Sequence, residues 1–293
     1  LSDWSSDVCS SDLEVADRRR HHVKARLGPT RGEGRAADLV SAGIRGGGLG
    51  HGGERLLDPS HTRPDGERQA VRRKPARGEP FLLAASLAAA LRERAETARK
   101  FGVRLLEAKS GYGLDEKSEL RSLEVIRKAK VPGLEIISTC MAAHAIPPEF
   151  RESRGEYVEL ILEKILPAVA KKRLAEYVDV FCDEGFFSVE ESLRIMRAAQ
   201  ALRLSTRVHG EELGLTGIAK LAAEAGAHSV DHLLKVDDSG IKALARTGCV
   251  AVLLPGTALY LREPPAPARR LIDEGAIVAL ASDFNPGTSP TQN

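Results

Sequence analysis

Short apolar runs alternate with longer helical patterns from residue 81 to the end of the chain, and this alternation constrains the fold most. The apolar runs predict seven strands, at residues 103–108, 134–139, 177–181, 205–208, 229–231, 249–254 and 277–281. The helical patterns occupy residues 82–100, 116–130, 156–173, 189–202, 213–225, 237–246 and 266–273. Strands that alternate with helices in this way predict a parallel sheet with right-handed crossovers.

A barrel accounts for this pattern better than a doubly wound nucleotide-binding sheet. Residues 81–293 contain no Gly-x-Gly-x-x-Gly turn, with which the nucleotide-binding fold holds a pyrophosphate. We therefore expect an α/β chain that forms a (β/α)₈ TIM-type barrel. In such a barrel the chemistry lies at the carboxyl ends of the strands.

The first 80 residues differ from the rest in charge and composition. Residues 14–80 hold 13 Arg and 2 Lys against nine acids, a net charge of +6, and they contain no Phe, Tyr or Trp. Residues 1–13 carry −3, so residues 81–293 carry only −1 of the total of +2. The isoelectric point of about 8.4 therefore comes from a segment without helical or strand periodicity.

We interpret the chain as three segments. Residues 1–13 resemble a translated sequencing adapter and are treated as non-native, whereas residues 14–80 form an Arg/Gly-rich segment that is either frame-shifted or disordered. Residues 81–293 form the partial barrel. A basic arm that binds nucleic acid is the alternative interpretation of residues 14–80, but no aromatic side chain is interleaved for base stacking.

The distribution of apolar residues and cysteines indicates the cellular compartment. No apolar stretch approaches the roughly 20 residues that a membrane-spanning helix needs, and the first residues lack the apolar core of a signal peptide. The four cysteines form no Cys-x-x-Cys pair and no disulfide framework. We expect a cytoplasmic protein that acts on a small molecule and binds neither membrane nor nucleic acid.

Residues suited to a metal site follow several of the predicted strands. His209 and Asp283 each stand just after a strand, and imidazole nitrogen and carboxylate oxygen are normal Zn²⁺ ligands. Glu212 could accept a proton from an activated water and return it to a leaving nitrogen. His232 could polarise a carbonyl. Each residue also has a structural interpretation, since the adjacent acids Glu211 and Glu212 could complement a helix dipole and Asp283 could cap a loop.

The loop after the last predicted strand offers groups for an anionic substrate. The Asn285 amide, the backbone N–H of Gly287 and the Thr288 hydroxyl together suit a carboxylate. His228 begins its strand and is interpreted as structural. Several such groups at strand ends favour metal-assisted hydrolysis.

Seven stretches of the sequence carry a family resemblance. They are residues 107–114 (EAKSGYGL), 143–149 (AHAIPPE), 179–185 (DVFCDEG), 209–212 (HGEE), 230–233 (VDHL), 253–257 (LLPGT) and 281–291 (ASDFNPGTSPT). In this order they resemble the imidazolonepropionases, hydrolases of histidine degradation in the metal-dependent amidohydrolase superfamily. The likeness extends from about residue 87 to the last residue.

The resemblance implies an activity and a set of roles. The activity is hydrolysis of the cyclic amide of 4-imidazolone-5-propanoate to N-formimidoyl-L-glutamate. His209 and Asp283 would hold Zn²⁺ or iron (Fe²⁺ or Fe³⁺), and Glu212, His232 and Asp283 would be catalytic. The substrate would contact Tyr112, His144, Asn285, Gly287 and Thr288. The intact parent enzyme would be a candidate homodimer.

The sequence also departs from the family pattern. The family's first barrel strand ends in His-x-His, which supplies two further ligands, whereas no His-x-His occurs in this chain. In residues 58–63 (DPSHTR), Arg63 stands where the second His would be. We therefore expect an incomplete barrel made of strands two to eight, with the family's small β-sandwich domain missing or garbled. Expressed as written, the chain is expected to be insoluble or inactive.

Two other functions remain open. Another amidohydrolase, such as an aminohydrolase of purines or pyrimidines, shares the metal-binding His, the nearby Glu and the late Asp, although residues 107–114 and 281–291 argue against it. A basic nucleic-acid-binding protein would owe its affinity to residues 1–80, and its binding would weaken with salt.

Overall fold

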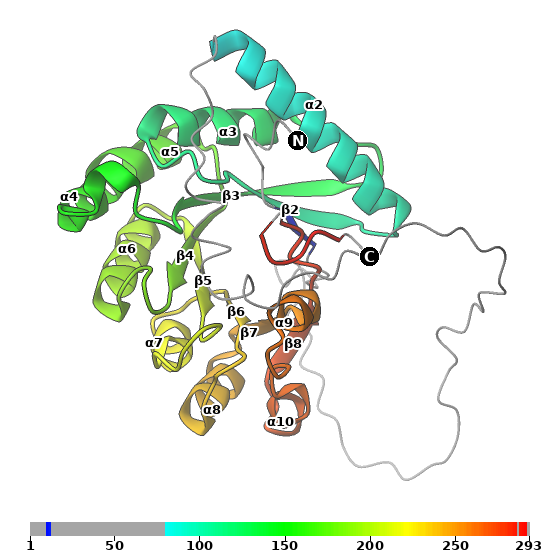
Figure 1. Cartoon of the computed structure of the whole chain (residues 1–293), viewed down its shortest axis with the longest axis vertical. Coiled ribbons are helices and arrows are strands. Elements are labelled where there is room, and N and C mark those ends of the chain that lie inside the picture. The colour runs from blue at the N-terminus through cyan, green and yellow to red at the C-terminus, as the bar shows by residue number, and fades with distance from the viewer. Residues whose placement is uncertain (1–9, 13–79, 286, 292–293) are drawn as a thin grey trace, which may run out of the picture. The chain divides into compact units, whose positions relative to one another are not determined.

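A curled sheet forms the framework of the chain in the computed structural model, which describes residues 10–12, 80–285 and 287–291 (Figure 1). Its strands are β1 (Ser10–Asp12), β2 (Leu105–Lys109), β3 (Glu135–Ala143), β4 (Tyr177–Cys182), β5 (Ser205–Gly210), β6 (Ser229–His232), β7 (Val250–Leu253) and β8 (Ile277–Leu280). Strands β2 to β8 are parallel and follow one another in chain order. The predicted incomplete barrel of seven parallel strands is thus confirmed.

Strand β1 comes from the segment that the sequence assigns to an adapter. It pairs antiparallel with β2, with Ser10 opposite Ala108 and Asp12 opposite Leu106. The interpretations of residues 1–9 and 13–79 lie outside the described residues, and so does the suggested relic at residues 58–63.

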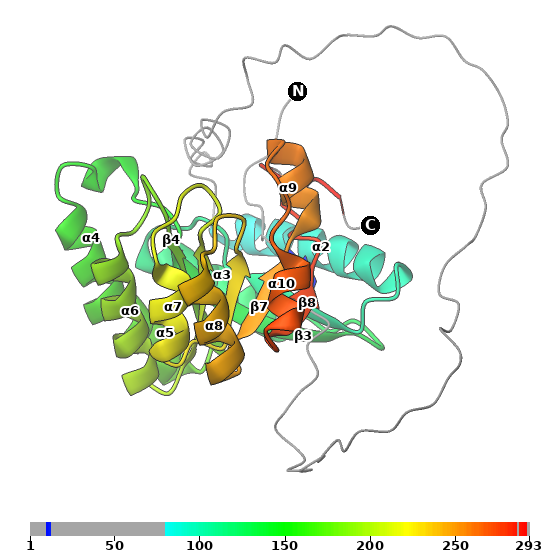
Figure 2. The ribbon, with the colours of Figure 1, turned by 90° about the horizontal axis from the view of Figure 1, so that it is seen from below.

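Helices connect the parallel strands, as the sequence pattern predicts. They are α2 (Pro80–Lys100), α3 (Glu116–Lys128), α4 (Arg154–Leu160), α5 (Leu166–Lys172), α6 (Val189–Ala201), α7 (Ile218–Glu224), α8 (Asp238–Thr247), α9 (Pro255–Leu261) and α10 (Ala268–Asp273). Figures 1 and 2 both show α4 to α8 in a row outside the sheet. None of the helices in the described part of the chain is long and apolar enough to cross a membrane.

Three helix predictions need correction. The single helix expected at 156–173 is α4 and α5 joined by a π-turn at Ile161–Ile165, next to Pro167, which has no backbone N–H to donate. Helix α7 begins at Ile218 rather than at residue 213, because the preceding N–H groups bond elsewhere. Helix α9 was not predicted; it begins with Pro255 at its first position.

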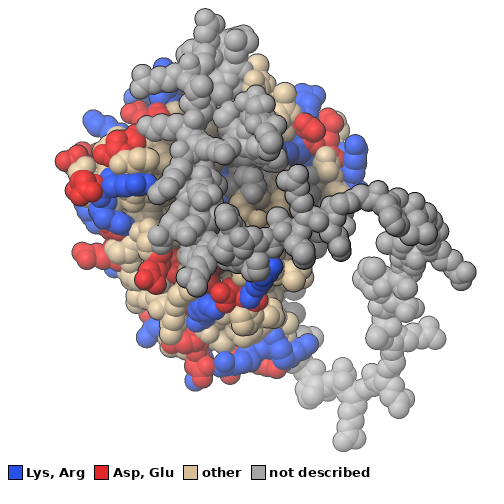
Figure 3. All heavy atoms as spheres, in the orientation of Figure 1, with Lys and Arg blue, Asp and Glu red and all other residues tan. Residues whose placement is uncertain are grey.

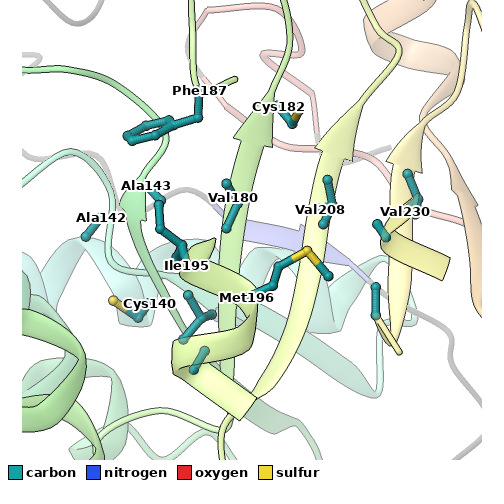
Figure 4. Packing of buried hydrophobic residues seen from close by; sticks show 14 of the residues in the cluster. Cys140, Ala142, Ala143, Val180, Cys182, Phe187, Ile195, Met196, Val208 and Val230 are labelled. Atoms are coloured by element: carbon teal, nitrogen blue, oxygen red, sulfur yellow. The ribbon is translucent and has the colours of Figure 1, made fainter. Parts of the chain in front are cut away.

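Side chains alternate between the two faces of the sheet and build two different layers. Cys140, Val180, Val208 and Val230 point outward and pack with the helices, for example against Met196 (Figure 4). This outer layer forms the main hydrophobic core, which buries most of the apolar surface that stabilises the fold.

The inner face of the sheet carries charged side chains on β2, β4, β5 and β6 and is apolar across β7 and β8. A small inner cluster joins Val250, Val252, Leu254 and Ala279. On β2, β4, β5 and β6 the inner positions carry buried ionisable groups instead: Glu107, Lys109, Asp179, Arg207, His209 and Asp231. Side chains usually fill the interior of such a barrel, so this part of the interior holds the molecule's chemistry.

Surface charges do not gather by sign on the face shown in Figure 3, where basic and acidic side chains are interspersed. This mixture agrees with the near-neutral charge of residues 81–293.

Candidate active site

The carboxyl ends of the parallel strands bring the predicted histidines together. His209 is at the end of β5, His232 ends β6, and His144 directly follows β3. The ring centroid of His209 lies 4.7 Å from that of His144 and 5.1 Å from that of His232. All three are buried, so residues 23 to 88 positions apart form one cluster because parallel strands end at one edge.

Asp179 on β4 lies at the centre of this cluster. Its Oδ1 is 3.1 Å from Nδ1 of His209 and 3.5 Å from Nε2 of His144. The ligand atoms of His144, Asp179 and His209 all lie within 4.8 Å of one another, as in a group that could hold a metal ion. Sequence reasoning named His209 as a ligand and His144 as a substrate contact, but it did not assign a role to Asp179.

A buried network of ion pairs lies next to the cluster and contacts it through Asp179. Nζ of Lys109 is 2.5 Å from Oδ2 of Asp179 and 3.2 Å from Oε1 of Glu107. Nη1 of Arg207 lies 3.1 Å from Oε2 of Glu107, and its guanidinium stacks on the Tyr177 ring at 4.0 Å. Buried charges require such partners, because desolvation of an unpaired charge costs several kcal/mol.

The network shifts the protonation of its members. Burial opposes charge on Glu107, but Arg207 and Lys109 outweigh it and lower the pKa to about 2. Burial likewise opposes charge on His209, yet the Asp179 carboxylate raises its pKa to about 9. Asp179 therefore orients the imidazole through Nδ1, which leaves Nε2 of His209 for another partner.

His232 and Glu212 form a second pair beside His209. Nε2 of His232 is 3.5 Å from Oε2 of Glu212, and both side chains are buried. Burial and the neighbouring His209 lower the pKa of His232 well below its usual range. A neutral imidazole next to a carboxylate can donate a hydrogen bond to a substrate oxygen while the carboxylate handles a proton.

The two adjacent glutamates after β5 face different partners. Oε1 of Glu211 accepts a hydrogen bond from the Ala219 backbone N–H in the first turn of α7, at 3.2 Å. The structural interpretation of this acidic pair thus describes Glu211, whereas Glu212 lies beside His232. Glu211 has a left-handed φ of 56°, and this backbone conformation lets the side chains of Glu211 and Glu212 point in different directions.

Asp283 follows β8 and is also buried. Its Oδ2 accepts a hydrogen bond from the Thr257 hydroxyl at 2.8 Å. Burial raises the pKa of Asp283, while His209 acts to lower it, so the two predicted metal ligands influence each other electrostatically.

The loop after β8 holds itself together through Asn285. Its Oδ1 accepts hydrogen bonds from the backbone N–H groups of Gly287 (2.8 Å) and Thr288 (2.7 Å), and its Nδ2 donates to the Asp283 carbonyl (2.8 Å). The N–H groups that sequence reasoning assigned to a substrate carboxylate therefore bond within the loop.

A buried carboxyl anchors the loop that carries Tyr112. Oε1 of Glu119 accepts from the Leu114 backbone N–H at 3.0 Å, and Oε2 bonds to the Ser110 hydroxyl. Oγ of Ser110 also accepts from the Met141 backbone N–H at 2.8 Å. Tyr112 itself is half-buried and has a left-handed φ of 37°.

Four of the residues around the site have positive φ although they carry side chains. They are Tyr112 (37°), Glu211 (56°), His232 (75°) and Asp283 (51°). Glycine tolerates this region far better than other residues. The surrounding structure thus holds the backbone in a form that aims these side chains.

Curated imidazolonepropionases are similar to this chain over about two thirds of its length. The protein of Clostridium tetani (strain Massachusetts / E88) is 48% identical over 203 residues, which cover 69% of this chain and 48% of that protein. The protein of Geobacillus thermodenitrificans (strain NG80-2) is 47% identical over 191 residues, which cover 65% and 45%. The resemblance stated from the sequence is confirmed, and the chain spans about half the length of these relatives. No protein-family model matches it.

Solved structures of two deaminases and of an amidohydrolase share the fold. The apo N6-methyl-AMP deaminase from Arabidopsis thaliana matches with a TM-score of 0.54 at 13% identity, covering 78% of this chain and 67% of that one. The guanine deaminase from C. acetobutylicum gives 0.53 at 16%, covering 72% and 53%. An amidohydrolase from Burkhoderia ambifaria with bound Zn gives 0.53 at 18%, covering 70% and 61%. At these identities the likeness concerns the fold alone.

Proposed function

We propose that residues 81–293 are the larger part of an imidazolonepropionase barrel, whose reaction adds water across the amide C–N bond of 4-imidazolone-5-propanoate and gives N-formimidoyl-L-glutamate. The observation that carries this proposal is the buried Glu212–His232 pair, 3.5 Å apart beside His209, in a chain 46–48% identical to curated imidazolonepropionases.

The donor set fits a divalent metal ion. Imidazole and carboxylate groups are buried together at one edge of the sheet, and His144, Asp179 and His209 already bring their ligand atoms within 4.8 Å. From this set we keep His209, and we assign Asp283 as the carboxylate ligand in place of Asp179, because Lys109 neutralises Asp179. A Zn or Fe ion held there supplies Lewis-acid activation for hydrolysis when it is bound.

The remaining roles belong to the side chains themselves. Glu212 takes a proton from the attacking water and returns it to the ring nitrogen that leaves, so the proton count balances. Neutral His232 donates a hydrogen bond to the carbonyl oxygen as negative charge develops on it. We assign contacts with the substrate to Tyr112, His144, Asn285, Gly287 and Thr288. The N–H groups of Gly287 and Thr288 would exchange their bonds with Asn285 for bonds to the substrate. The three described cysteines are free and buried, which supports a reducing, cytoplasmic compartment.

The experiment is an exchange of segments. The matched part of this chain replaces the equivalent part of the Clostridium tetani relative, and loss of imidazolone propanoate is followed spectroscopically with Zn²⁺ or Fe²⁺ present. We expect turnover by the chimera and none by the chain alone, because the sequence contains no His-x-His. A chimera that folds and binds metal but deaminates guanine or adenine instead would refute the proposed substrate.

A further inference from the structure

Asp183, the residue that follows β4, has a carboxylate that accepts hydrogen bonds from four backbone N–H groups. Oδ2 of Asp183 accepts from the N–H groups of Glu212 and Leu213, both at 2.9 Å. Oδ1 accepts from Gly214 at 3.0 Å and from Glu184 at 2.9 Å. Three of the four donors belong to the loop that follows β5, and Asp183 is itself buried.

We propose that Asp183 is a positioning residue that fixes Glu212 for proton transfer. This inference rests on the proposed function, in which Glu212 is the general base. Asp183 is assigned no contact with the substrate. It acts through the backbone of the loop, which it holds from the neighbouring strand.

The loop needs such an anchor because it is neither strand nor helix. After Gly210 the chain leaves the sheet, and α7 begins only at Ile218. Without Asp183, the N–H groups of residues 212–214 would lose their partners in the described structure. A buried N–H group without a partner is unfavourable because its desolvation is not compensated, so the loop would move to find other acceptors.

Further contacts hold the loop just before Glu212 and determine what Asp183 contributes. The carbonyl of Glu211 accepts from the Lys235 backbone N–H at 2.8 Å, and the Glu211 side chain bonds to Ala219. Because these contacts fix the chain up to residue 211, Asp183 fixes the backbone conformation between Glu211 and Glu212. This conformation directs the Glu212 carboxylate toward His232.

The first measurement uses the full chain without any substitution. We expect the amides of residues 212–214 to exchange hydrogen slowly, although they lie outside every helix and strand ladder. If they exchange as fast as exposed loop amides, Asp183 does not hold them, and the inference is wrong whether or not the protein is a hydrolase.

The second measurement replaces one oxygen of the anchor. Asp183→Asn keeps one acceptor and points an N–H₂ group at the donors facing the other oxygen. We expect faster exchange among the four amides that bond to Asp183, at residues 184 and 212–214, and unchanged exchange elsewhere. Asp115→Asn is the matched control, since Asp115 accepts from the Ser118 backbone N–H at the start of α3, which follows β2 and not β5.

The third measurement separates positioning from folding. In the chimera, Asp183→Asn should lower kcat by about 10²-fold, the effect of roughly 1 Å of misplacement, with KM and metal content nearly unchanged. Faster exchange without a fall in kcat would overturn the positioning role and leave the proposed function intact. A parent chimera without turnover would instead count against the proposed function.

Discussion

Glu119→Gln tests whether a buried carboxyl keeps its proton in the folded chain. Glu119 lies on α3, is fully buried, and bonds to Ser110 and to the Leu114 N–H. Burial raises its pKa from 4.5 to about 7, although these hydrogen bonds act in the opposite direction. The folded chain therefore holds this proton over a pH range in which the unfolded chain has released it.

The size and sign of the effect follow from linkage. Below pH 4.5 both states are protonated, and the stabilising contribution of Glu119 is fully present. It is lost as the pH rises from 4.5 through 7, and a shift of about 2.5 pKa units corresponds to about 3 kcal/mol. Glutamine resembles the neutral acid at every pH. Relative to wild type, Glu119→Gln should thus change little at pH 4.5 and stabilise the chain by about 3 kcal/mol at pH 8.

The assay is urea unfolding followed by circular dichroism at pH 4.5 and pH 8, with the chain refolded from urea if it is recovered insoluble. The control is Glu124→Gln, which removes an exposed carboxylate from α3, the helix that also carries Glu119; this carboxylate pairs with Lys172 of α5. The control substitution should change the free energy of unfolding by less than about 1 kcal/mol. An equal difference between Glu119→Gln and wild type at both pH values would refute the reasoning.

Three further changes test other parts of the structure. Lys109→Met leaves Glu107 and Asp179 without their shared cation and should lower the free energy of unfolding by about 3–5 kcal/mol. The control Arg246→Met removes an exposed ion pair and should lower it by less than about 1 kcal/mol. Equal losses for the two variants in urea titrations would contradict this prediction. Gly210→Ala places a methyl group against Cγ2 of Ile218 and should cost about 1–3 kcal/mol by the same assay, with recovery in the Ile218→Ala background as the check. In the chimera, His232→Gln should lower kcat by about 10²-fold or more while metal content stays constant; an unchanged kcat would remove His232 from the proposed mechanism.

Local patterns in the sequence were sufficient to predict the strands and the edge at which the site forms. Apolar runs fix β2 to β8 to within a few residues, because a strand buried on its outer face must be apolar there. The positions of His209 and His232 then follow, since both stand where a run ends. The presence of Glu212 near His232 also follows from parallel strands that end at one edge.

Contacts between distant residues could not be predicted in the same way. Lys109 and Asp179 are 70 positions apart, and Asp183 and Glu212 are 29 apart, so nothing local marks either pair. The start of α7 was misjudged: residues 213–217 (LGLTG) contain two glycines, which disfavour a helix, and Asp183 takes the N–H groups of Leu213 and Gly214. Charged residues on the inner face of the barrel are visible in the sequence only as interruptions of apolar runs.

The residues with left-handed backbone around the site create a trade-off between stability and activity. A side chain in this backbone region costs roughly 1 kcal/mol or more relative to glycine, and Tyr112, Glu211, His232 and Asp283 all occupy it. In a library selected only for resistance to heat or protease, glycine and asparagine should accumulate at these four positions. In a library selected for catalysis by the chimera, the original side chains should persist at His232 and Asp283. Substitutions that raise the thermal stability of such a barrel without loss of activity would therefore have to lie in the outer core and in the helices that cover it.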